Sequence, residues 1–229
     1  GRARAEKAGM IKPVRYKCLV LDHDDTVVNS TATIHYPSFV KFMKAYRPDE
    51  IPTIEKYLFD NFQGLTHFFH EVMHFTPEEE AAQYACWADY VETHVPPAFD
   101  GMADFLARYR AAGGHICVVS HSLRKNILRD YRENGLPEPE MIFGWDEPEE
   151  MRKPSPGPLR AIMQAFSLNP SDLLMVDDLK PGKDMADACG VDFAAVGWGT
   201  YVPEIAAFMR AQSRIYCETP QDLQALVFS

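Results

Sequence analysis

Residues 16–30 read Tyr-Lys-Cys-Leu-Val-Leu-Asp-His-Asp-Asp-Thr-Val-Val-Asn-Ser. The first part, Lys17 to Leu21, is a short apolar run without a helical period, which predicts a buried strand of a parallel sheet. This strand runs directly into four polar residues, Asp22, His23, Asp24 and Asp25. In open α/β sheets the ligand crevice lies at the carboxyl ends of the strands. The stretch therefore predicts acidic side chains at the place where a substrate binds.

Two of these acids, Asp22 and Asp24, are separated by one residue, so on an extended segment they project to the same side. Two carboxylates about 4 Å apart repel each other by roughly 4 kcal/mol at an effective dielectric constant near 20. A cation or a shared proton is therefore expected beside them. The alternative is that an Asp-rich turn simply follows the strand.

The pattern Asp-x-Asp-x-Thr after an apolar strand, formed by Asp22, Asp24 and Thr26, resembles the first motif of the haloacid dehalogenase superfamily of phosphoryl-transfer enzymes. The resemblance implies that Asp22 is the nucleophile and Asp24 the general acid/base. Thr26 is expected to order the loop and is a candidate phosphate contact. The chain departs from the family at Asp25, where Gly is most common. Because Asp tolerates unusual backbone angles better than most residues, the turn can survive, but the role of Asp25 stays open.

The composition is that of an ordinary globular protein, with 229 residues, 46% hydrophobic and 24% charged residues. The formal net charge of −10 argues against a nucleic-acid partner, because such binding depends on Lys and Arg. We also expect no membrane partner, since no apolar run approaches the roughly 18 residues of a membrane span. The odd number of cysteines predicts reduced thiols in a cytoplasmic protein; they are Cys18, Cys86, Cys117, Cys189 and Cys217.

The segment 34–98 predicts a helical insertion, because aromatic and apolar residues recur there at helical spacing. Three or four amphipathic helices without an intervening strand are too long for one crossover connection. In the superfamily that it resembles, a helical cap at this position closes over the active site. We therefore expect a cap domain at 34–98, a core domain at 10–33 and 99–229, and a disordered tail at 1–9.

Three histidines of the insertion, His67, His70 and His74, have the spacing of one helix face. They predict either a metal or phosphate-facing surface or, alternatively, a solvated or partly packed face. The candidate substrate contacts are Asn61, Gln63 and His67, and Gly64 is expected in a loop or a close contact above the active site.

Two further motifs follow in the second half of the chain. His115–Val119 predicts a strand that ends at Ser120, ahead of a helix predicted at Ser122–Glu133. A hydroxyl there is suited to bind a phosphate oxygen, although a helix cap is the alternative. Ser120 is similar to the second motif of the superfamily, which implies a phosphate ligand, with His121 beside it. Lys153 in Lys-Pro-Ser-Pro is similar to the third motif, which implies neutralisation of phosphoryl charge; the alternative is a solvated lysine.

The fourth motif is a pair of acids, Asp177 and Asp178, at the end of a strand predicted from Leu173. If they face Asp22 and Asp24, the four residues complete a set of hard oxygen ligands that suits Mg²⁺. The resemblance implies that Asp178 is a direct ligand and Asp177 a direct or water-mediated one. It also implies ligation by the Asp22 carboxylate and the Asp24 backbone carbonyl. Gly182 aligns with the Gly or Asp that follows the acid pair, and Asp184 is the alternative acid.

These motifs together predict an α/β fold, a Rossmann-like, mostly parallel sheet flanked by helices, with an inserted α-helical cap. The function expected is a Mg²⁺-dependent phosphatase of the phosphoglycolate phosphatase and β-phosphoglucomutase-like group. It would act on a small phosphorylated metabolite as a monomer or weak homodimer. A phosphomutase with the same residues is the alternative. A dehalogenase has no use for Asp24, and a non-catalytic binding protein would be expected to have lost some of the acids.

Overall fold

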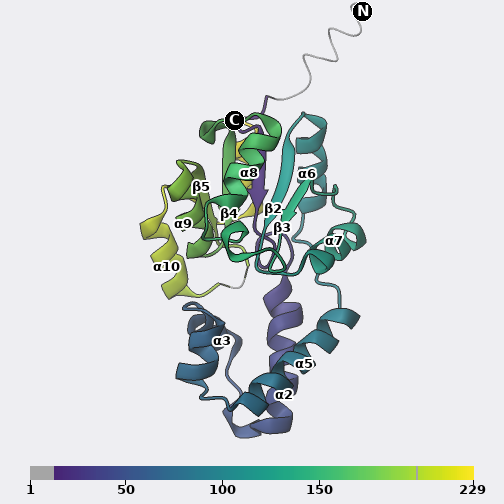
Figure 1. Cartoon of the computed structure of the whole chain (residues 1–229), viewed down its shortest axis with the longest axis vertical. Helices are drawn as coiled ribbons and strands as arrows, with labels where there is room; N and C mark the ends of the chain where they lie inside the picture. Colours follow the sequence, from purple (N-terminus) through teal and green to yellow (C-terminus); the bar gives the residue numbers. More distant parts are fainter. Residues whose placement is uncertain (1–12, 200) are drawn as a thin grey trace, which may run out of the picture.

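The computed structural model describes residues 13–199 and 201–229. In this part of the chain six parallel strands form one sheet in the order β3-β2-β1-β4-β5-β6 (Figure 1). The strands are β1 (Cys18–Leu21), β2 (His115–Val119), β3 (Met141–Phe143), β4 (Leu173–Asp177), β5 (Asp192–Val196) and β6 (Ile215–Cys217). The predicted α/β fold with a mostly parallel sheet is therefore confirmed. The tail predicted at residues 1–9 lies outside the described residues.

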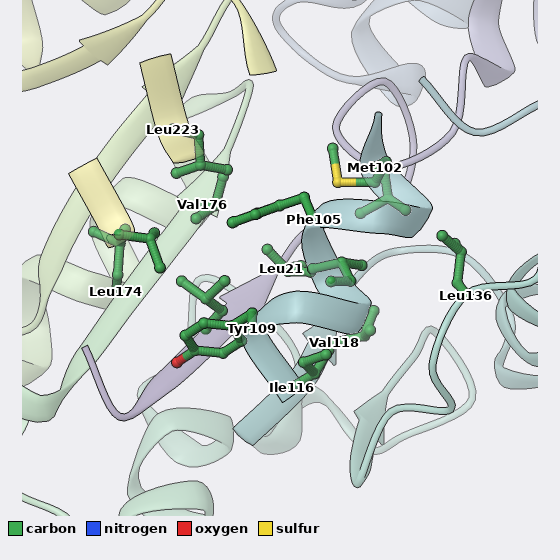
Figure 2. Close-up of a cluster of buried hydrophobic side chains, with 14 of the residues drawn as sticks. Leu21, Met102, Phe105, Tyr109, Ile116, Val118, Leu136, Leu174, Val176 and Leu223 are labelled. Atoms are coloured by element: carbon green, nitrogen blue, oxygen red, sulfur yellow. The ribbon is translucent and has the colours of Figure 1, made fainter. Parts of the chain in front are cut away.

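Strand β1 lies inside the sheet and is buried on both of its faces, as its unbroken apolar run predicts. Leu19 and Leu21 pack with α6 (Met102–Ala111), α7 (Arg124–Glu133) and α11 (Pro220–Val227). Figure 2 shows this cluster, in which Leu21 and Phe105 of α6 lie beside strand residues such as Val118. This packing fixes the position of the end of β1, and therefore the position of Asp22, which follows it.

The opposite face of the sheet carries Cys18 and Val20, which pack with α8 (Gly157–Phe166), α9 (Lys180–Cys189) and α10 (Pro203–Gln212). The sequence pattern does not predict helix α10, because residues 191–199 indicate a strand and a loop and the next predicted element is a strand from Arg214. Only Met209 of α10 is fully buried, with Ile205 and Phe208 partly buried beside it, and such a short apolar face gives a weak periodic signal. None of the helices in residues 13–199 and 201–229 has both the length and the apolar composition that a bilayer crossing needs.

The inserted helices lie beyond the carboxyl ends of the strands and apart from the sheet (Figure 1). They are α2 (Tyr36–Tyr46), α3 (Ile54–Asn61), α4 (Leu65–His67) and α5 (Pro77–Thr93). They enclose a separate aromatic core that includes Phe39, Phe42 and Phe68. Because this segment has its own core, we propose that it is a cap domain, with the division at 34–98 given above.

The histidine row does not lie on one helix. Gly64, at φ 104°, interrupts the chain after α3, and residues Phe68–Val72 form a π-helix. A π-helix has more residues per turn than an α-helix, so the three- and four-residue spacing no longer keeps side chains on one face. His74 then leaves the helix at φ 51°. The prediction of a single helix face for His67, His70 and His74 is therefore wrong.

Candidate active site

The site is built where β1 and β4 end side by side. Leu21 pairs with Val176 in the sheet, so the next residues, Asp22 and Asp177, leave neighbouring strands at the same level. Lys153, from the loop before α8, places its Nζ 2.7 Å from Asp22 Oδ1 and 2.8 Å from Asp177 Oδ2. All three side chains are buried. The first, third and fourth sequence motifs therefore meet in one contact.

Burial and mutual repulsion shape the charges of this cluster. Burial, together with the charge of the neighbouring Asp22, raises the pKa of Asp177 to about 6, against the attraction of Lys153. The pKa of Asp178 is also raised, for the same two reasons. For Lys153, burial works against the charged form, but Asp177 and Asp22 together raise its pKa. The lysine is therefore a fixed ammonium between two carboxylates.

Three acids of this cluster fit a divalent cation. Oxygen atoms of Asp22, Asp177 and Asp178 all lie within 4.8 Å of one another. Three carboxylates carry more negative charge than one ammonium neutralises, and hard oxygen donors are the ligands that Mg²⁺ prefers. The alternative acid, Asp184, instead pairs with Lys180 at 2.9 Å on helix α9 and is not in this group.

Asp24 directs its carboxylate elsewhere. Its Oδ1 lies 3.1 Å from His35 Nε2, and its Oδ2 accepts a hydrogen bond from the Ser122 hydroxyl. The indole of Trp87, which can only donate, lies 3.0 Å from His35 Nδ1. Nδ1 therefore accepts, and Nε2 carries the proton donated to Asp24. Burial alone would raise the pKa of Asp24, but the hydrogen bonds from His35 and Ser122 hold it well below its usual value.

The carboxylate of Asp24 is therefore not part of the three-acid group. The expectation that the side chains of Asp22 and Asp24 project to the same side assumed an extended segment, but β1 ends at Leu21 and the chain then turns, with Asp25 at φ 60°. The turn separates the side chain of Asp24 from those of the three-acid group. Only its backbone carbonyl, as predicted, remains available as a ligand, and this role stays a prediction.

Asp25, the departure from the family pattern, links the acidic loop to the start of the cap. Its Oδ1 accepts the backbone N–H of Thr31 at 2.9 Å, and its Oδ2 accepts the Thr31 hydroxyl. Thr31 is the first residue of the π-helix Thr31–His35 that leads into α2. Gly199 makes room for this loop, since a Cβ there would lie 2.9 Å from the Asp25 carbonyl oxygen.

The remaining predicted residues contact protein groups in this structure. The Thr26 hydroxyl donates to Asp22 Oδ2 at 3.1 Å, as expected for a residue that orders the loop. Ser120 Oγ accepts the Ser122 N–H at 3.0 Å, and His121 Nε2 lies 2.9 Å from the Lys153 carbonyl oxygen, to which it donates. The contact between Ser122 N–H and Ser120 Oγ lies in the turn after β2, and the helix predicted from Ser122 begins at Arg124. Phosphate binding by Ser120, His121 and Thr26 stays a prediction.

A cavity of about 1060 Å³ lies between the strand ends and the cap. Asp24, Asp178 and Ser122 line it from the core side, and His35 and Trp87 line it from the cap side. The candidate contacts Asn61, Gln63 and Gly64 are also in its wall, whereas His67 and His70 are not among the residues that line it. His70 instead lies 2.9 Å from Glu80.

Sequence reasoning missed three residues of the site, Ser122, His35 and Trp87. Ser122 follows the predicted phosphate ligand by two residues, so its place near the strand end could have been inferred. His35 and Trp87 lie 11 and 63 residues beyond Asp24, at positions without a motif, and only the packing of α2 against α5 brings them to it. No signal in the sequence identified them.

Comparison with known proteins agrees with this arrangement. A family model described as "Haloacid dehalogenase-like hydrolase" matches residues 19–196. A phosphoglycolate phosphatase from Thiobacillus denitrificans is 24% identical over 199 residues, which are 82% of this chain and 86% of that protein.

Solved structures share the fold. A predicted phosphoglycolate phosphatase from Haemophilus somnus has a TM-score of 0.75 at 16% identity, covering 93% of this chain and 98% of that one. A haloacid dehalogenase family hydrolase from Deinococcus radiodurans, solved with bound phosphate and sodium, has a TM-score of 0.73 at 18% identity, covering 94% and 99%. The family model spans the ends of β1, β2 and β4 and the loop that carries Lys153. The chain therefore belongs to the haloacid dehalogenase-like hydrolase family and is an enzyme of that type.

Proposed function

We propose that the protein is a Mg²⁺-dependent phosphatase that hydrolyses a small phosphorylated metabolite through an aspartyl-phosphate on Asp22. One observation carries this proposal. A buried lysine, Lys153, is held between Asp22 and Asp177, with Asp178 in the same acidic cluster at the edge of a large cavity. The proposed nucleophile, a fixed positive charge and a set of cation ligands are thus in contact with one another at the ends of β1 and β4.

The two aspartates of the first motif have different roles in the proposed reaction. Asp22 attacks phosphorus, so that a bond forms from its carboxylate oxygen while the bond to the leaving oxygen breaks. Asp24 gives a proton to that oxygen. In this structure the hydrogen bonds from His35 and Ser122 outweigh burial and keep Asp24 as a carboxylate, so we assign the uptake of this proton to the substrate-bound state. Asp24 then takes a proton from the water that hydrolyses the aspartyl-phosphate and releases inorganic phosphate.

Charge on the transferring phosphoryl group is neutralised from the other side. Lys153 supplies a positive charge, and Ser120 and His121 are the predicted partners of phosphate oxygens. Asp22, Asp177, Asp178 and the Asp24 carbonyl would hold Mg²⁺, which when bound clamps and neutralises a phosphate oxygen. A phosphatase from T. denitrificans and a fold relative that binds phosphate support this choice. The five cysteines are all free, which supports a reducing cytoplasmic location.

The test measures phosphate release from a panel of phosphorylated metabolites at millimolar Mg²⁺. A phosphatase releases inorganic phosphate in proportion to the substrate consumed. A phosphomutase, which uses the same residues, converts a sugar phosphate to its isomer with little net release. Stoichiometric isomer formation would replace our proposal with the mutase.

Mg²⁺ is expected to raise the melting temperature of the wild-type protein. A ligand that binds only the folded state at 100 times its dissociation constant stabilises that state by about 2.7 kcal/mol. For a chain of this size the shift is about 5–10 °C. The measurement compares thermal unfolding in chelator with unfolding in millimolar Mg²⁺. The variant Asp178→Asn should lose most of the shift and Asp184→Asn should keep it; equal shifts in both variants would contradict a site at Asp178.

Gly182→Ala is expected to lower turnover at least tenfold because Gly182 faces the side chain of Asp177. A Cβ at this position would lie 2.1 Å from Asp177 Oδ2. The carboxylate must move, and with it the contact to Lys153. Alanine improves helix propensity by about 1 kcal/mol, while overpacking costs about 1–3 kcal/mol, so we expect a net loss of stability of at most about 2 kcal/mol. Steady-state kinetics and thermal unfolding measure the two effects separately, and full turnover with a lowered melting temperature would contradict the argument.

A further inference from the structure

The cavity between core and cap has several exposed hydrophobic side chains in its wall. Among the described residues, seven large hydrophobic side chains are strongly exposed, and four of them line this cavity. These four are Leu65, Tyr84, Trp145 and Tyr201. Tyr84 and Tyr201 are each 62% exposed and Trp145 is 53% exposed. Exposed aromatic rings gathered on a concave surface indicate a ligand that covers them.

The acidic and basic side chains in the same wall are all acidic, apart from histidines. The side chains that line the cavity include Asp24, Asp25, Glu80 and Asp178, and within the described residues they include no Lys or Arg. Histidines do not reverse this balance. Burial, together with Lys153, lowers the pKa of His121, which favours its neutral form. His35 is bound to Asp24, and His70 outside the wall is bound to Glu80.

Two cations beside the cavity are already engaged in contacts. Lys153 lies beneath the cavity between Asp22 and Asp177, where it serves the phosphoryl group. Arg152 stacks on Trp145, with its guanidinium carbon 4.1 Å from the centre of the ring, and donates to the Trp145 carbonyl at 3.3 Å. A carboxylate or second phosphate on the substrate would therefore meet carboxylates and aromatic rings on a wall that, within the described residues, no Lys or Arg side chain lines.

We propose that the substrate is a phosphate monoester whose leaving group is apolar or aromatic and carries no acidic group. This inference rests on the proposed phosphatase function and narrows its substrate class. It separates this protein from an enzyme built for phosphoglycolate, whose leaving group bears a carboxylate. It also disfavours the mutase alternative, because a sugar bisphosphate carries a second phosphate that this wall does not match.

Hydrolysis of matched esters tests the charge argument. Benzyl phosphate and 4-carboxybenzyl phosphate differ by one remote carboxylate, and 2-hydroxyethyl phosphate and phosphoglycolate form a second, non-aromatic pair. We expect kcat/KM to be at least tenfold higher for the uncharged member of each pair, and highest for benzyl phosphate. Preference for phosphoglycolate over 2-hydroxyethyl phosphate would overturn the inference and leave the phosphatase function intact.

Variants test the wall itself. Tyr84→Ala should raise KM for benzyl phosphate about threefold to tenfold, the range expected for one aromatic contact, and leave 2-hydroxyethyl phosphate unaffected. The matched control is Tyr46→Ala, since Tyr46 is 53% exposed on the cap and does not line the cavity. Gln83→Arg adds a cation to the wall and should raise the ratio of phosphoglycolate to benzyl phosphate turnover at least tenfold. Equal behaviour of the Tyr84 and Tyr46 variants, with no effect of Gln83→Arg, would overturn the inference.

Binding separates a failure of the inference from a failure of the function. The phosphonates 2-phenylethylphosphonate and 3-phosphonopropionate imitate benzyl phosphate and phosphoglycolate but cannot be hydrolysed at the phosphorus–carbon bond. Calorimetry with Mg²⁺ present should show at least tenfold tighter binding of the phenyl compound. That preference without hydrolysis of any ester would overturn the phosphatase function and support the binding inference. Equal or reversed affinities would overturn the inference whatever the turnover.

Discussion

Asp22→Asn abolishes turnover and leaves the protein folded, which is the largest single effect that we expect. An amide is a poor nucleophile and a weaker Mg²⁺ ligand than a carboxylate, so the aspartyl-phosphate cannot form. The expected loss in kcat is at least about 10⁴-fold. The fold survives because Lys153 keeps its contact with Asp177, so no buried charge is left without a partner. Phosphate release from benzyl phosphate measures the activity, and circular dichroism with thermal unfolding measures the fold.

The matched control is Asp184→Asn, which makes the same chemical change at an acid outside the three-acid group. Asp184 is on α9 and pairs with Lys180. Its replacement should leave turnover unchanged within about twofold, because an exposed pair of this kind contributes little even to stability. Phosphate release by Asp22→Asn at a rate near that of the control would remove Asp22 from the mechanism.

The residues of the cluster were predictable because they follow buried strands. A strand buried on both faces is a strong sequence signal, and the polar residue that ends it is fixed in space by the register of the sheet. Leu21 and Val176 pair in that register, so Asp22 and Asp177 had to meet. Lys153 lies in a loop, and only its resemblance to the third motif linked it to them. The strands predicted at Lys17–Leu21, at His115–Val119 and from Leu173 are all present, within one residue of the predicted positions.

The contacts of the Asp24 side chain could not be predicted, because they do not follow from the register of buried strands. Its carboxylate position depends on the turn at Asp25, a residue with positive φ, and on the packing of two cap helices that carry His35 and Trp87. Neither the turn nor the packing leaves a periodic pattern in the chain. The histidine row failed in a similar way, because one glycine and one π-helical turn change which side chains share a face. Local irregularities of this kind decide specificity and are weakly encoded.

Asp24→Asn is expected to impair the two half-reactions unequally. An aryl phosphate needs little protonation of its departing oxygen, so its first step should survive better than that of an alkyl phosphate. Hydrolysis of the aspartyl-phosphate still requires a base, so this step should slow by about 10²–10⁴-fold. The covalent intermediate should then accumulate on Asp22. Intact-protein mass spectrometry would detect it as an added phosphoryl group after mixing with phenyl phosphate.

The design of this variant keeps the rest of the site in place. Asparagine has nearly the shape of aspartate, and its amide oxygen can still accept a hydrogen bond from His35 or Ser122. The backbone carbonyl that we assign to Mg²⁺ is unchanged, so the Mg²⁺-induced shift in melting temperature should persist.

Ser122→Ala is the positioning control, because it removes one hydrogen bond to Asp24 but keeps the carboxylate. It should lower the turnover of aryl and alkyl phosphates modestly, and no phosphoryl-enzyme should accumulate. Equal losses on aryl and alkyl esters in Asp24→Asn, without a trapped phosphoryl-enzyme, would assign the acid/base role to another residue. Asp25 would then be the next candidate, although its carboxylate is bound to Thr31 in this structure.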